Sequence, residues 1–113
     1  MIMTDRELLE AAAKAAGMLG EWLDGMGWLE YPGCPRFWNP LTDDGDALRL
    51  AVKLQFNVCH YGDCVIAGHW KTPPNTDSEE WTGMIGADPY AATRRAIVRA
   101  AAAIAQSNDR SES

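Results

Sequence analysis

The stretch at residues 38–54 constrains the fold most strongly, because it joins an aromatic loop to a short amphipathic helix. Thr42 or Asp43 can cap the helix, and apolar residues then recur at positions 47, 48, 51, 52 and 54. We predict a helix from Asp43 or Asp44 to Leu54. Three carboxylates near its start are interpreted as charges that stabilise the positive end of the helix dipole, rather than as cation ligands: Asp43, Asp44 and Asp46.

Two further helices are predicted near the ends of the chain. The first opens with a capping box between Thr4 and Glu7 and runs to Gly17, and its many alanines suggest close approach to a sheet. The second begins at Asp88-Pro89, with the aspartate as cap and the proline in the first turn. Residues 107–113 are polar and predict a flexible tail, which leaves one domain over residues 1–106.

The remaining apolar segments alternate as strands do. Residues 55–61 and 64–70 surround Gly62-Asp63, which predicts a hairpin with Tyr61 opposite Cys64. A further strand is expected at 79–85, and two short strands or extended pieces at 18–37. The fold class is therefore α+β, an antiparallel sheet packed with three helices. The predicted core comprises Leu8, Ala12, Leu48, Ala51, Val52, Phe56, Val58, Val65, Ile97 and Ala101.

Charge and composition exclude several classes of function. The net charge of -6 opposes binding to duplex nucleic acid, which depends on lysine and arginine neutralising phosphates. The sequence shows neither a signal peptide nor a long apolar run, so we expect a location in the cytoplasm and no contact with membranes. An odd count of three cysteines favours free thiols.

The hairpin holds the tightest group of chemically active residues: Cys59, His60, Cys64 and His69. Thiolates and imidazoles bind zinc, but the predicted register turns the two histidines away from the cysteines. A nucleophilic pair of Cys59 or Cys64 with His69 would need both groups on one side and an oxyanion donor. We therefore expect neither catalytic nor metal-binding residues, and no cofactor.

Arginines and tryptophans offer candidates for binding. Arg94, Arg95 and Arg99 are interpreted as a solvated helix face, with a phosphate or acidic-protein contact as the alternative. Three of the five tryptophans fall in or beside the irregular segment at 20–40, as a lid on the core or as a partner surface. The predicted partner-binding residues are Trp22, Asp24, Trp28, Glu30, Tyr31, Phe37 and Trp38.

Three blocks of the sequence, at residues 4–17, 38–54 and 88–102, together resemble small bacteriophage and prophage proteins that carry the phage alpha-beta-alpha sandwich domain. The resemblance implies an alpha-beta-alpha sandwich-like fold and a phage origin, in a family largely without assigned function. We expect a non-enzymatic accessory protein that binds a host protein or ribonucleoprotein, such as a CRISPR-Cas defence complex inhibited by anti-CRISPR proteins. The alternative is a small-molecule or nucleotide-binding protein with an aromatic pocket, and a monomer or a homodimer suits either.

Overall fold

Three helices and two antiparallel sheets make up the fold, which confirms the predicted α+β class. The computed structural model describes residues 4–24, 27–31, 36–62, 64–68, 80–84 and 88–111. Its elements, in chain order, are α1 (Asp5–Ala15), β1 (Leu19–Leu23), β2 (Gly27–Tyr31), β3 (Arg36–Trp38), α2 (Asp44–Leu54), β4 (Asn57–Tyr61), β5 (Cys64–Gly68), β6 (Glu80–Met84) and α3 (Pro89–Ser111).

The helix ends follow the capping residues in the sequence. Thr4 and Glu7 form the predicted capping box of α1, and Gly17 ends that helix at a φ of 69°. Asp43, not Thr42, caps α2 by accepting the N–H of Asp46 at 2.7 Å. Local sequence therefore places both helices to within a residue or two.

Helix α3 begins as predicted and ends later than expected. The carboxylate of Asp88 accepts the N–H groups of Tyr90 and Ala91, both at 3.1 Å. The helix then continues to Ser111, well into the stretch at 107–113 that the sequence suggests is a tail. Polar residues on a long helix whose earlier turns are packed can extend it beyond its last apolar contact.

The six strands form two separate sheets. In the first, with order β1-β2-β3, Trp22 pairs with Trp28 and Trp28 pairs with Trp38. In the second, with order β4-β5-β6, Tyr61 pairs with Cys64, which confirms the predicted hairpin register. Strand β4 begins at Asn57 rather than at residue 55, because Gln55 takes a left-handed conformation that ends α2.

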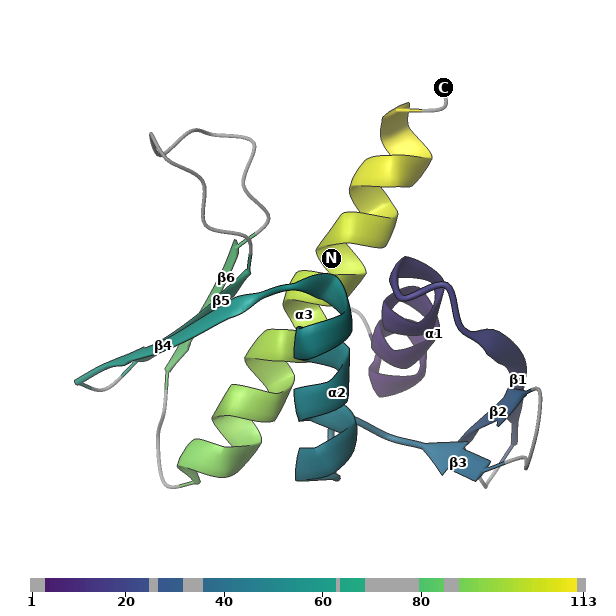
Figure 1. The fold of residues 1–113 in the computed structure, drawn as a ribbon, viewed down its shortest axis with the longest axis horizontal. Coiled ribbons are helices and arrows are strands. Elements are labelled where there is room, and N and C mark those ends of the chain that lie inside the picture. Colours follow the sequence, from purple (N-terminus) through teal and green to yellow (C-terminus); the bar gives the residue numbers. More distant parts are fainter. Residues whose placement is uncertain are drawn as a thin grey trace.

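The helices lie between the two sheets (Figure 1). Helix α3 contacts β5 and β6 on one side and α1 and α2 on the other. The sheet β1–β3 contacts α1 at the opposite end of the molecule. Strands β1–β3 thus form a sheet of their own, apart from the one built by β4–β6.

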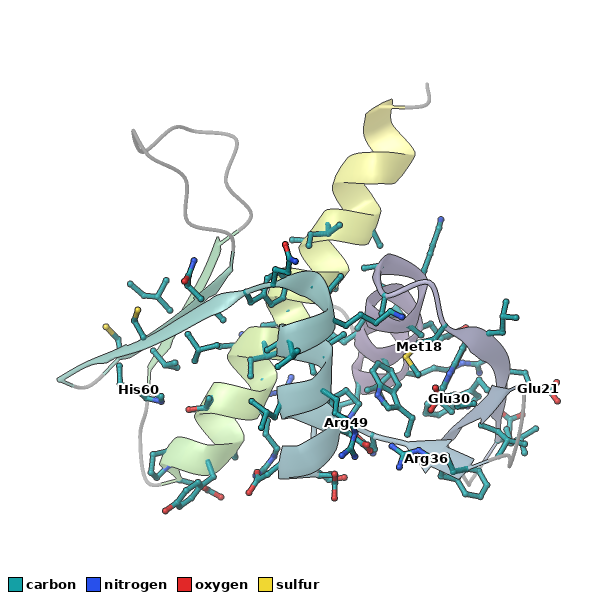
Figure 2. The ribbon with its side chains drawn as sticks, in the orientation of Figure 1. Met18, Glu21, Glu30, Arg36, Arg49 and His60 are labelled. Atoms are coloured by element: carbon teal, nitrogen blue, oxygen red, sulfur yellow. The ribbon has the colours of Figure 1, made fainter. Side chains whose placement is uncertain are left out.

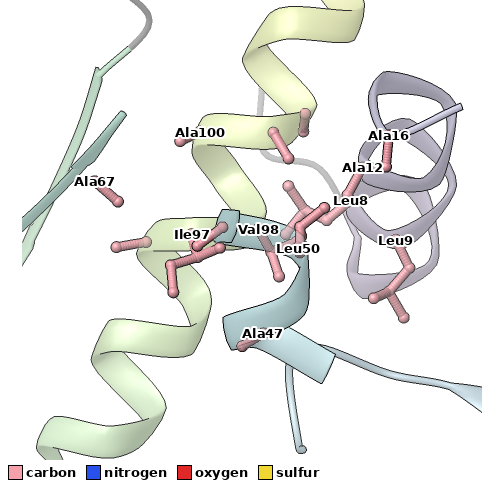
Figure 3. Packing of buried hydrophobic residues seen from close by; sticks show 14 of the residues in the cluster. Leu8, Leu9, Ala12, Ala16, Ala47, Leu50, Ala67, Ile97, Val98 and Ala100 are labelled. Carbon is pink, nitrogen blue, oxygen red and sulfur yellow. The ribbon is translucent and has the colours of Figure 1, made fainter. Parts of the chain in front are cut away.

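Small apolar residues fill the contact between α1 and α3 (Figure 3). Ala12 and Ala13 of α1 and Ala101 of α3 are fully buried, whereas Ala100, also fully buried, lies on the side of α3 that faces β5 (Figure 3). The alanines of α1 therefore allow close approach to a helix, and the expected approach to a sheet is wrong in this respect. Leu8, Ala51, Val65 and Ile97 are also buried as predicted, while Phe56 and Val58 are half-buried.

The prediction that Leu48 and Val52 of α2 belong to the core is wrong, since these side chains are 64% and 68% exposed. The helix faces the core with Ala47, Leu50 and Ala51 instead. The stripe with Leu48 and Val52 and the stripe with Ala47 and Leu50 are both apolar and lie side by side on α2. The periodicity of the sequence therefore cannot show which of the two stripes is buried. Tyr90, at the start of α3, is likewise 69% exposed.

Candidate functional site

The predicted partner-binding residues gather on the sheet β1–β3, with Asp24 in the turn after β1. Their side chains divide between the two faces of the sheet. Trp22, Trp28 and Trp38 pair across the three strands and share the face toward the helices. Trp38 is only 4% exposed, and the other two are half-buried against the core. The tryptophan row therefore covers the core, as a lid would.

The outer face of the same sheet is apolar and open to solvent. Leu19 and Phe37 are 66% and 44% exposed, and Leu29, which pairs with Phe37, is half-buried. Glu21 points outward from this face, whereas Glu30 lies on the helix-facing side (Figure 2). The predicted partner-binding residues, which are aromatic or acidic, do not include Leu19 and Leu29. The strand pairing would identify them, because they alternate with the tryptophans.

Charged residues at the edges of the sheet are partly paired. Asp24 is almost fully exposed and lies 3.5 Å from a guanidinium nitrogen of Arg6, which also stacks over Trp22 at 5.4 Å from the ring centroid. Glu30 lies 3.5 Å from Nε of Arg36. The side chain of Tyr31 lies outside the described part of the chain.

A cavity of about 550 Å³ opens on the inner side of the sheet, between the end of α1, strands β2 and β3, and α2. Its lining residues are Ala16, Met18, Glu30, Arg36, Trp38, Arg49, Leu50 and Lys53. Figure 2 shows Arg36 and Glu30 reaching this region from the sheet and Arg49 reaching it from α2. Two of the predicted residues, Glu30 and Trp38, belong to this cavity.

A buried carboxylate supports the two arginines of the cavity. Asp46 is 5% exposed, accepts the N–H of Asn39 at 3.0 Å and pairs with Arg49 at 2.8 Å and with Arg36. Burial raises the pKa of this carboxyl, but the Asn39 hydrogen bond and the two guanidiniums outweigh burial, and the net pKa is lowered. The Asp46 charge in turn raises the pKa of Arg36.

A second, more apolar groove of about 510 Å³ lies between α2, the start of α3 and β4. Exposed Leu48 and Tyr90 stand on its walls, and Ala51, Val58 and Ile97 also line it. At its rim Nε2 of His60 lies 2.8 Å from the hydroxyl of Thr93. The exposed residues Leu48 and Tyr90 therefore border an open groove and not the closed core.

The hairpin does not assemble a metal or nucleophile site within the part of the chain that the structure describes. The confirmed register turns Cys59 and Cys64 to one face and His60 to the other, where it meets α3. The described residues contain no group of three or more metal-ligating side chains. Cys34 and His69 lie outside the described residues.

Two arginines of α3 join elements together. Arg94 donates to the carbonyl of Leu41 at 2.8 Å and pairs with Asp44 at 2.6 Å, which ties α3 to the start of α2. Arg95 pairs with Asp5 of α1 at 3.0 Å. The interpretation of these side chains as a solvated face is therefore incomplete, because both also hold helices in place.

No known protein family, curated protein or solved structure matches this chain. The resemblance to phage sandwich proteins consequently stays a prediction. Among the described residues, no helix is both long and apolar enough to cross a bilayer.

Proposed function

We propose that this chain is a non-enzymatic binding protein that docks a basic protein partner on the outer face of the sheet β1–β3. The supporting observation is the exposure of Leu19 and Phe37 on a regular sheet, with Leu23 and Leu29 half-buried beside them. Isolated exposed apolar residues are common, but a cluster on one flat face is typical of an interaction surface. Covering that cluster would remove apolar area from water.

The charges around this face favour a basic partner. Glu21 lies within the face, Asp24 is almost fully exposed at its end, and the chain carries a net charge of -6. Such charges speed association with lysine- and arginine-rich surfaces and repel acidic ones. The partner that fits is a protein with an apolar patch surrounded by basic residues.

The class of partner to test first comes from the resemblance to phage proteins. A bacterial defence complex such as a CRISPR effector has basic channels for nucleic acid, which an acidic protein can occupy. In this proposal the chain contacts the effector by its sheet face and competes with target DNA.

The test compares two pairs of exposed apolar residues on different surfaces. Leu19→Lys with Phe37→Lys alters the sheet face, and Leu48→Lys with Val52→Lys is the matched control on α2. Both variants should keep the parental circular dichroism spectrum. Binding to a purified CRISPR effector, and inhibition of its target-DNA binding, should be lost in the first variant and retained in the second.

Other results would overturn the proposal. Equal binding by the parent and the sheet variant would remove the sheet face from the interface. A parent that binds no effector would overturn the proposed partner class. A dimeric parent that becomes monomeric only in the sheet variant would assign this face to self-association.

A further inference from the structure

The cavity between sheet β1–β3 and α2 is lined by more basic than acidic side chains, in a chain that is acidic overall. Three basic side chains line it, Arg36, Arg49 and Lys53, against one lining carboxylate, Glu30. Arg49 and Lys53 lie one turn apart on α2, and Arg36 approaches from β3. We propose that this cavity binds a small organic phosphate monoester, an activity separate from the protein contact on the outer face of the sheet.

The arginines are oriented but keep donors for a ligand. A guanidinium carries five N–H donors. Arg36 directs Nε to Glu30 and one terminal nitrogen to Asp46, and Arg49 directs one terminal nitrogen to Asp46. The other N–H groups of both side chains make no hydrogen bond or ion pair within the described residues. Asp46 thus holds two guanidiniums in place, and holding a binding group in place lowers the entropy lost on binding.

The balance of charge favours an anion over a cation. Asp46 lies buried behind the arginines, and both of its oxygens already accept hydrogen bonds. Asp43 approaches Arg49 no closer than 3.9 Å and is committed to capping α2. Lys53 is exposed and makes no ion pair within the described residues, so its ammonium is free to meet a ligand.

Size and apolar walls indicate that the anion carries an organic part. Met18, Trp38 and Leu50 supply apolar lining, and the volume of about 550 Å³ is that of a small-molecule site. Inorganic phosphate alone would leave this part of the cavity unfilled. A doubly charged phosphate also suits two guanidiniums and an ammonium better than a singly charged carboxylate does.

Isothermal titration calorimetry with three probes tests the proposal. Phenyl phosphate should bind with a Kd of roughly 1 mM or lower, inorganic phosphate should bind at least about tenfold more weakly, and benzoate more weakly still. Lys53→Gln should weaken phenyl phosphate binding by about tenfold, because an exposed lysine can be changed without disturbing the fold. Arg6→Gln, a half-exposed arginine of α1 outside the cavity, is the matched control and should bind as the parent does.

Each alternative outcome overturns part or all of the proposal. Absence of phenyl phosphate binding by the parent overturns the site. If phenyl phosphate and inorganic phosphate bind with equal affinity, the inference that the ligand carries an organic group is wrong. If benzoate binds as tightly as phenyl phosphate, the inferred preference for a phosphate group is wrong. Equal weakening in Lys53→Gln and Arg6→Gln would show general charge attraction instead of a cavity. The variant with Leu19→Lys and Phe37→Lys should bind phenyl phosphate as the parent does. The phosphate site and the protein-binding face can therefore be tested independently of each other.

Discussion

Replacing Asp46 with alanine should destabilise the fold by about 3 kcal/mol, because this buried carboxylate joins three segments. It accepts the N–H of Asn39 in the loop before α2 and pairs with Arg49 on α2 and with Arg36 on β3. The alanine variant would leave the Asn39 N–H without its acceptor and both guanidiniums without their shared partner.

The magnitude follows from the exposure of each partner. A hydrogen bond to a charged acceptor contributes about 1.5–3 kcal/mol, and this range applies to the Asn39 bond, since its acceptor is 5% exposed. Arg36 and Arg49 are half-exposed or more, so each pair contributes only about 0.5 kcal/mol after screening. A carboxylate in the first turn of α2 adds about 0.5 kcal/mol through the helix dipole.

Urea unfolding followed by circular dichroism would measure the loss. Asp46→Asn retains an acceptor oxygen and should lose about half as much stability as Asp46→Ala. Asp44→Ala, which removes an exposed carboxylate of the same helix turn, should lose less than about 1 kcal/mol. The reasoning is refuted if Asp46→Ala lies within about 0.5 kcal/mol of the parent, or if Asp44→Ala is equally destabilised.

Acid should remove the contribution of Asp46. Its pKa is lowered in the folded protein, so the unfolded chain binds this proton more readily. The stabilisation is therefore complete above the unfolded pKa of about 3.9 and is lost as the pH falls through the folded pKa. Denaturation curves of parent and Asp46→Asn should converge over that range. A stability difference that stayed constant down to about pH 2 would contradict this assignment.

Four further substitutions test the packing and the backbone. Gln55→Gly should raise the free energy of unfolding by about 0.5–1 kcal/mol, because Gln55 ends α2 at a φ of 59°, and a lower urea midpoint would contradict this. Gly20→Ala should destabilise by about 2 kcal/mol or more, since its Cβ would lie 2.3 Å from the backbone oxygen of Leu29; unchanged thermal unfolding would disprove that contact. Ile97→Ala should lose about 2–4 kcal/mol and Leu48→Ala less than about 1 kcal/mol, and the reverse order in chemical denaturation would show that α2 is turned differently.

Local signals in the sequence predict the beginnings of the three helices and the register of one hairpin. Thr4, Asp43 and Asp88 each cap a helix, and Gly62 lies in the turn that places Tyr61 opposite Cys64. These features depend on residues within a few positions of one another, and short-range hydrogen bonding and turn geometry decide them.

The candidate sites could be predicted only in part. The sequence predicts a partner-binding surface on the aromatic segment from Trp22 to Trp38, and it leaves open whether the tryptophans cover the core or form the interface. Strand pairing decides that they share the helix-facing side and leaves Leu19 and Phe37 outside. Alternation along each strand is visible in the sequence, but the side that meets the helices is not.

By itself, the sequence determined the α+β class, the helix caps and the hairpin register. Only the tertiary structure decided that Leu48 and Val52 remain exposed while Ala47 and Leu50 are buried, and that Asp46, in the first turn of α2, also holds Arg36 of β3. The physical reason is that burial and charge pairing depend on which surface packs against an element. The packing surface is supplied by residues far away in the chain, and the periodicity of a local segment does not indicate which of its faces they will cover.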